Sequence, residues 1–77
     1  MKEYLSTINE LFNSLLNRTI FLTLETSPKD VEGWDSMFQA QLIEAIERKF
    51  DIKFKFREIL SWEKVGDIIN SLNSHLC

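Results

Sequence analysis

Apolar residues recur at steps of three and four in three separate segments of this chain, and this spacing constrains the fold more than any other feature. The segments are residues 3–16, 36–50 and 62–76. Such spacing places the apolar side chains on one face of a helix. Three amphipathic helices in 77 residues predict a small helical domain in which these faces pack against one another.

The segments between the predicted helices contain β-favouring residues and leave the local structure open. Residues 19–24 (TIFLTL) and 52–56 (IKFKF) are compatible with short strands or with extended linkers. If the two segments paired, the fold would be α+β. The alternative is a long first loop and a short connector, both held by apolar residues that dock on the helices.

We favour the second alternative, because a single strand has no certain partner here. Leu22 or Leu24 is expected to dock from the first loop, and Ile52 and Phe54 from the connector. A short helical turn is expected at residues 57–60. The predicted fold is therefore an all-α four-helix bundle with three long helices, a short third helix and a long first loop.

Length and composition fit one small folded domain over residues 1–77. The formal net charge of −3 argues against a nucleic-acid-binding protein, which normally carries a basic patch. No apolar run is long enough to span a membrane, and the N-terminus lacks the apolar stretch of a secretory signal. We therefore expect a cytoplasmic monomer.

The chain has few residues suited to metal binding or catalysis. Its single histidine and single cysteine, His75 and Cys77, can form neither a disulfide nor a zinc site of the Cys/His kind. We expect His75 to be solvated in the last helical turn and Cys77 to be incidental. Pairs of nucleophile and base are nearly excluded by this inventory. The sequence thus predicts a protein that is not an enzyme and holds no metal.

Asp35 and Ser36 directly precede the second helical pattern and allow two interpretations. Both residue types are favoured helix N-caps, whose side-chain oxygen accepts a free N–H of the first turn. Alternatively, the Ser36 hydroxyl is the attachment point of a phosphate ester, because the start of a helix favours an anion. Trp34 is expected to pack its ring over the loop and fix the approach of the chain to Ser36.

The last predicted helix has two features near its start. Ser61 or a neighbour is expected to be its N-cap. Gly66 lies in the first turn, where it costs about 1 kcal/mol relative to alanine. A bulky group packed closely against this glycine would explain its presence.

Three short motifs follow in order along the chain: Asp35-Ser36-Met37, Glu47-Arg48-Lys49-Phe50 and Val65-Gly66-Asp67-Ile68. Together they resemble the stand-alone members of the acyl carrier protein (phosphopantetheine-binding) family. The pattern of that family is Asp-Ser-Leu/Met, an amphipathic helix ending in Glu-x-x-Phe, a loop, and Val-Gly-Asp-hydrophobic. Asp-Ser alone is a weak signal, whereas the ordered set is specific, and the resemblance covers nearly the whole chain.

The resemblance implies a four-helix bundle in which residues 19–24 and 52–56 are mainly loop. It implies that a phosphopantetheinyl transferase, using coenzyme A and magnesium, attaches 4′-phosphopantetheine to Ser36, with Asp35 in support. The terminal thiol of that arm, rather than Cys77, would carry an acyl or aminoacyl group as a thioester. Loading ligases or transferases and downstream synthase enzymes would then be the partners that perform the chemistry.

The resemblance also implies a partner-docking surface on the second helix, formed by Met37, Phe38, Gln41, Glu44, Glu47 and Arg48. Carriers of primary fatty acid synthesis usually present a strongly acidic second helix there. Of the positions often acidic in that group, only Glu47 keeps its charge here. For Phe38, an outward and a partly buried position are both open.

This mixed surface favours a specialised pathway, because charge complementarity mainly sets partner choice and encounter rate. Polyketide, nonribosomal, aminoacyl and envelope-glycan pathways are examples, in preference to housekeeping fatty acid biosynthesis. The alternative function is an unmodified, carrier-like interaction domain in which Ser36 is only an N-cap. In that case Ser36→Ala would cost about 1 kcal/mol of stability and leave function intact.

Overall fold

The computed structural model describes residues 2–76, with side-chain environments for residues 3–76. Within this range the chain forms α-helices and one short 3-10 turn and contains no strand. The elements are α1 (Lys2–Leu16), η1 (Pro28–Asp30), α2 (Ser36–Phe50), α3 (Phe56–Ser61) and α4 (Val65–Leu76). The predicted four-helix bundle with a short third helix is confirmed, and strand pairing between the two β-favouring segments is ruled out.

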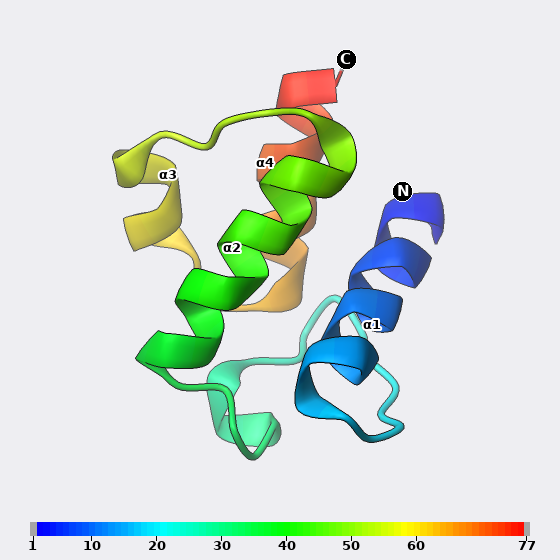
Figure 1. Cartoon of the computed structure of the whole chain (residues 1–77). Coiled ribbons are helices and arrows are strands. Elements are labelled where there is room, and N and C mark those ends of the chain that lie inside the picture. Colours follow the sequence, from blue (N-terminus) through cyan, green and yellow to red (C-terminus); the bar gives the residue numbers. More distant parts are fainter. Residues whose placement is uncertain (1, 77) are drawn as a thin grey trace.

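The three long helices form the body of the bundle. α1 contacts both α2 and α4, while the short α3 contacts α4. In Figure 1, the connection from α1 to α2 runs below the bundle, and α3 lies on the side away from α1. Among the described residues, no helix combines the length and the apolar character needed to cross a membrane.

The core is built from the apolar faces of the long helices and from three residues of the connecting segments, Leu22, Val31 and Phe54. Leu22 of the first loop and Phe54 of the α2–α3 connector are both buried, as predicted. Leu24, the other candidate in the loop, is 39% exposed. The buried hydrophobic residues are Ile8, Phe12, Leu22, Val31, Phe38, Leu42, Ile46, Phe54, Val65, Ile68, Ile69 and Leu72.

Two asparagines of α1 hold the first loop in place. The Asn13 side-chain oxygen accepts the backbone N–H of Ile20 at 2.8 Å, and that of Asn9 accepts the N–H of Leu22 at 2.6 Å. The Asn9 amide also donates to the Ile20 carbonyl at 3.1 Å. These side chains satisfy backbone groups that would otherwise need a neighbouring strand. Residues 19–24 therefore remain extended without belonging to a sheet.

The start of α4 differs from the prediction that this helix begins near residue 62 with Ser61 as N-cap. Ser61 instead ends α3, where its hydroxyl donates to the carbonyl of Glu58 at 2.7 Å. α4 begins at Val65. The carboxylate of Asp67 accepts the backbone N–H groups of the two residues before Val65, at 2.8 and 3.2 Å. Asp67 thus fixes the two residues before the helix, and no serine caps α4.

Gly66 lies directly against the backbone of the first loop. Its N–H donates to the carbonyl oxygen of Leu24 at 2.8 Å, and the N–H of Val65 donates to Thr26 at 2.8 Å. A Cβ atom added to Gly66 would lie 2.9 Å from the Leu24 oxygen. The expected close packing is confirmed, and the neighbour is a peptide carbonyl rather than a bulky side chain.

His75 is not solvated, contrary to the prediction. Its Nε2 atom lies 2.9 Å from a Glu58 carboxylate oxygen, and the side chains of the pair are 23% and 21% exposed. Its ring also meets the Phe54 ring edge-on, with 5.4 Å between centroids. The pair joins the end of α4 to α3, whereas Cys77 lies outside the described residues.

This pairing shifts the titration of Glu58. Burial alone would raise the pKa of the carboxyl, but hydrogen bonds from the backbone N–H of Lys55 and from His75 outweigh it. The pKa of Glu58 is therefore held below its ordinary value of 4.5. The ionised form stabilises the docking of α3 on α4.

We expect Gly66→Ala to destabilise the protein by about 2 kcal/mol, although alanine is the better helix former. The added methyl group must push the Leu24 carbonyl away and weaken its hydrogen bond to the N–H of residue 66. Urea unfolding followed by circular dichroism measures the change. Asn70→Ala, at an exposed position of α4, is the matched control and should change stability by a few tenths of a kcal/mol at most. Equal stability of the two variants would contradict the close approach.

Glu58→Gln tests the pair between α3 and α4 through its pH dependence. Because the folded-state pKa of Glu58 is lowered, its contribution is present above its ordinary value and is lost as the pH falls through the folded value. We expect the variant to be less stable than the wild type at neutral pH, with the difference shrinking well below pH 4.5. Urea unfolding at both pH values gives the two differences. A difference that does not change with pH would contradict this role.

Candidate functional site

The turn before α2 positions its first residues. Gly33 has φ +97°, a conformation that residues with a side chain rarely adopt, and a Cβ atom there would lie 3.1 Å from Leu16. The N–H of Trp34 donates to the carbonyl of Val31 at 3.2 Å, and that of Asp35 donates to Gly33 at 3.1 Å. The chain therefore reverses beside the end of α1 and enters α2 in one fixed direction.

Asp35, rather than Ser36, is the N-cap of α2. Its backbone is extended, with φ −119° and ψ −171°. Its carboxylate accepts the N–H of Phe38 at 2.9 Å, and its carbonyl accepts the N–H of Gln39 at 2.8 Å. The suggestion that Ser36 is the cap is wrong, since the preceding residue already fills that role.

Ser36 is the first helical residue of α2 and is exposed. Within the described part of the chain, its hydroxyl has no hydrogen-bond partner. The first turn of α2 contains no acidic residue, so the only neighbouring carboxylate in sequence is that of the cap, Asp35. Ser36 thus presents a free hydroxyl at the N-terminal end of a 15-residue helix.

An aromatic cluster of Phe12, Trp34 and Phe38 packs this turn against α1 and α2. The Trp34 ring meets Phe12 of α1 edge-on at 4.9 Å between centroids, and Phe12 meets Phe38 of α2 at 5.1 Å. The Trp34 indole N–H donates to the side-chain oxygen of Gln39 at 2.7 Å. Trp34 packs its ring as expected, but its ring partners are side chains of α1 and α2 and not the loop.

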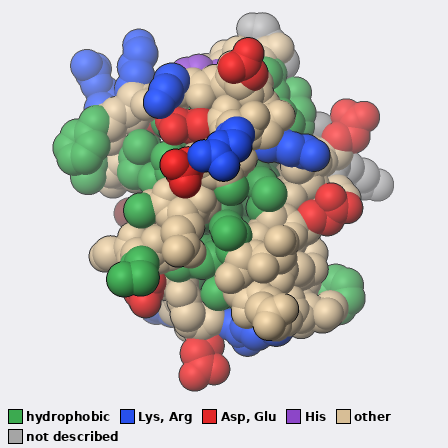
Figure 2. Space-filling model, viewed as in Figure 1, with side chains coloured by type: hydrophobic (Ala, Val, Ile, Leu, Met, Phe, Trp, Pro, Cys, Tyr) green, Lys and Arg blue, Asp and Glu red, His purple; other side chains and the backbone are tan. Residues whose placement is uncertain are grey.

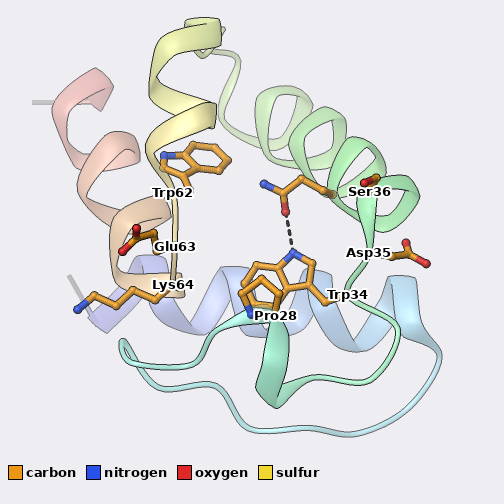
Figure 3. Close-up of a pocket in the computed structure, with 8 residues that line it drawn as sticks. Pro28, Trp34, Asp35, Ser36, Trp62, Glu63 and Lys64 are labelled. Carbon is orange, nitrogen blue, oxygen red and sulfur yellow. Dashed lines mark hydrogen bonds between the residues drawn. The ribbon is translucent and has the colours of Figure 1, made fainter.

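A groove opens directly beside Ser36. It has a volume of about 320 Å³ and runs between the start of α2 and the α3–α4 connection. Figure 3 shows the Trp34 and Trp62 indoles on its two sides, with Ser36 at one end. The lining residues are Pro28, Trp34, Asp35, Ser36, Gln39, Trp62, Glu63 and Lys64.

Both indole N–H groups in the groove are satisfied inside the protein. Trp62 donates to the Ser71 hydroxyl at 2.9 Å, as Trp34 does to Gln39. The two rings therefore offer apolar faces and edges to the groove. Lys64 supplies a cation at the rim, and its hydrogen bond to the Glu25 carboxylate, 3.2 Å away, raises the pKa of the Lys64 ammonium.

The structure places four of the six predicted docking residues on the surface. Met37 is 74% exposed beside Ser36, and Gln41 is exposed farther along α2. Glu44 and Arg48 are also exposed and form an ion pair one helical turn apart, at 3.5 Å. Such exposed pairs contribute little to stability, so both groups remain open to a partner.

Two predicted docking residues have structural positions instead. Phe38 is 5% exposed and packs against Phe12 and Trp34, which contradicts its assignment to the docking surface. Glu47 is half-buried, and its carboxylate accepts the N–H of Phe54 at 2.8 Å. The acidic residue of the Glu-x-x-Phe motif thus fixes the connector that follows α2.

Sequence analysis did not identify Pro28, Trp62, Glu63 and Lys64 as neighbours of Ser36. They come from segments on either side of α2, and helical periodicity gives no information on such contacts. The available signal was Gly66, because its close approach to the first loop brings the start of α4 towards the segment that leads to Ser36.

The cap geometry predicts different effects for the two residues of the Asp-Ser pair. We expect Asp35→Ala to lower the free energy of unfolding by about 1 kcal/mol, because it removes the cap. Ser36→Ala should leave it within a few tenths of a kcal/mol, since no hydrogen bond is lost. Chemical unfolding of both variants measures this, with Asp35→Asn as a control that keeps a capping oxygen. A larger loss for Ser36→Ala than for Asp35→Ala would overturn the assignment.

Comparison with known proteins finds relatives among solved structures. No protein-family model matches the chain, and a search of curated proteins also finds no match. Among solved structures, the chain resembles a holo acyl carrier protein from Geobacter metallireducens, with a TM-score of 0.87 and 32% sequence identity. That alignment covers 94% of this chain and 84% of the other.

A second solved structure is a candidate acyl carrier protein from Mycobacterium tuberculosis. It aligns with a TM-score of 0.82 and 30% identity, over 90% of this chain and 93% of the other. The similarity in sequence and fold thus extends over most of each chain. The chain belongs to the acyl carrier protein family.

Proposed function

We propose that this protein carries an acyl or aminoacyl group on a 4′-phosphopantetheine arm attached to the Ser36 hydroxyl. The observation that carries the proposal is that the two residues of the Asp-Ser pair have different roles. Asp35 caps the helix, while the Ser36 hydroxyl is exposed and has no partner among the described residues. A serine with no structural task at this place suits a site of modification.

The same observation weakens the alternative, in which the chain is an unmodified interaction domain with Ser36 as a cap. The cap is provided by the preceding residue, so a hydroxyl at position 36 is not needed for folding. The holo form of the Geobacter metallireducens carrier supports modification within the family. We therefore retain only the carrier function.

The start of α2 is chemically suited to a phosphodiester. Free N–H groups and the positive end of the helix dipole favour a negative charge there, and the first helical turn carries no acidic side chain. The Asp35 carboxylate is adjacent, but it accepts a hydrogen bond from the N–H of Phe38. The groove beside Ser36 gives an arm attached there the apolar surfaces of Trp34 and Trp62.

Attachment requires a separate phosphopantetheinyl transferase with coenzyme A and magnesium. The Ser36 oxygen forms a bond to phosphorus, the pyrophosphate bond of coenzyme A breaks, and the serine proton and the nucleotide half leave. On this chain, Ser36 supplies the nucleophile, and Asp35 is the adjacent carboxylate that supports the meeting with the transferase and its metal.

Once attached, the arm supplies a terminal thiol on which the acyl or aminoacyl group is held as a thioester. The chain itself positions the arm, while a loading ligase or transferase and downstream synthase enzymes perform the reactions. The exposed surface of α2 carries Met37, Gln41 and the Glu44–Arg48 pair rather than a run of carboxylates. We therefore assign the carrier to a specialised biosynthetic pathway.

Co-expression with a broad-specificity phosphopantetheinyl transferase tests the attachment. We expect the intact mass to rise by that of one phosphopantetheine, and a peptide map to place the adduct on Ser36. Ser36→Ala is the matched control and should remain unmodified while keeping its helical circular dichroism spectrum. An unmodified wild type, or an adduct that persists in Ser36→Ala, would contradict the proposal.

A further inference from the structure

Positive charge is concentrated in one short part of this acidic chain. Residues 48–57 contain five of the nine Lys and Arg residues and only one of the twelve Asp and Glu residues. The remainder of the chain holds four cations and eleven acidic residues. The segment with the positive charge covers the end of α2, the connector and the start of α3.

The backbone turns these cations outward together with two apolar side chains. In the extended connector, Phe54 is buried and its neighbours Lys53 and Lys55 are exposed. In α3, Arg57 is exposed, while Phe56 and Leu60, one helical turn apart, are 73% and 69% exposed. We name the set Lys53, Lys55, Phe56, Arg57 and Leu60 the basic α3 face. Figure 2 shows Lys and Arg side chains gathered over this region, beside an exposed hydrophobic side chain.

The basic α3 face is held in a fixed position. The Glu47 carboxylate accepts the N–H of Phe54 at 2.8 Å, and the Glu58 carboxylate accepts that of Lys55 at 2.8 Å. Glu58 is also paired with His75 of α4. Among the described residues, Lys53, Lys55 and Arg57 form no ion pair. In the part of the chain that the structure describes, these three cations therefore have no carboxylate within ion-pair distance.

We propose that the basic α3 face is a docking surface for a partner protein that presents acidic residues around an apolar pocket. Cations at the rim would steer the encounter and select an acidic partner, and the exposed Phe56 and Leu60 would fill the pocket. The proposal goes beyond the carrier function, because it does not require modification of Ser36.

The arrangement favours a protein over a membrane or a nucleic acid. Glu44, Glu47 and Asp51 line a depression together with Lys53 and Arg48, so carboxylates adjoin the basic α3 face on the side of Lys53. An extended polyanion bound across this region would be attracted by the cations and repelled by the neighbouring carboxylates. A protein surface can place its own acidic residues opposite the cations alone. The net charge of −3 also opposes binding to a polyanion.

Site-specific photo-crosslinking in living cells of the source organism identifies the partner. One variant carries the crosslinking residue in place of Phe56, and the control carries it in place of Phe21, which is 87% exposed in the first loop. A protein captured at position 56 but not at position 21 is then purified, and its dissociation constant is measured with defined variants of the unlabelled chain.

We expect Arg57→Glu to weaken binding about tenfold or more at low salt, and less at high salt. Lys29→Glu, at an exposed lysine of η1, should have little effect. Phe56→Ala should also weaken binding, whereas Phe21→Ala should not. Ser36→Ala should bind the captured partner as tightly as the wild type, because the basic α3 face does not include Ser36. This result would make the docking proposal independent of the proposed modification of Ser36.

Three results would overturn the proposal. The first is the absence of a protein captured specifically at position 56. The second is equal binding by Arg57→Glu and Lys29→Glu. The third is sedimentation of the wild type, but not of Phe56→Ala, with vesicles of phosphatidylcholine and phosphatidylglycerol, since this would assign the surface to a membrane.

Discussion

The fixation of the first loop between α1 and α4 is the constraint on which the position of Ser36 depends. Residues 17–35 form a long connection, and their position is set by hydrogen bonds to Asn9 and Asn13 on one side and to Val65 and Gly66 on the other. A buried polar backbone needs such partners wherever it lacks a sheet. Because the loop is fixed, the turn at its end can deliver Ser36 at a defined place.

This constraint also explains how a serine can stand at a helix start without capping it. The positive φ of Gly33 and the aromatic contacts of Trp34 set the direction of the chain before Asp35. The Asp35 carboxylate then reaches the N–H of Phe38, and the next residue enters the helix with its hydroxyl outside. Capping of the helix and the proposed modification thereby fall to two adjacent side chains, and a change in one need not impair the other.

The sequence predicted what depends on local spacing, and it failed where distant segments meet. The bounds of α2 were predicted from periodicity, and the docking of Leu22 and Phe54 from their apolar character. Phe38 was left open, although it lies four residues before Leu42 and eight before Ile46 and therefore shares their buried stripe. That error was avoidable from the pattern alone.

The other differences have no local signal of this kind. The contact between His75 and Glu58 joins residues 17 positions apart on separate helices. At the start of α4, the N–H groups of Val65 and Gly66 donate to carbonyls of the first loop, about 40 residues earlier in the chain, and not to a nearby serine. The groove beside Ser36 requires the first loop, α2 and the α3–α4 connection to be placed together.

The groove beside Ser36 and the basic α3 face are linked through α3. α2 spans about 20 Å from Ser36 to its end, given the rise of an α-helix. The basic α3 face begins beyond that end, and α3 then leads to Trp62, which lines the groove together with Ser36. Phe56 lies at the start of α3, and Trp62 directly follows the end of this six-residue helix. A partner docked on Phe56 and Leu60 is therefore close to the groove. Docking on Phe56 and Leu60 does not itself require contact with the Ser36 hydroxyl, which lies at the other end of α2.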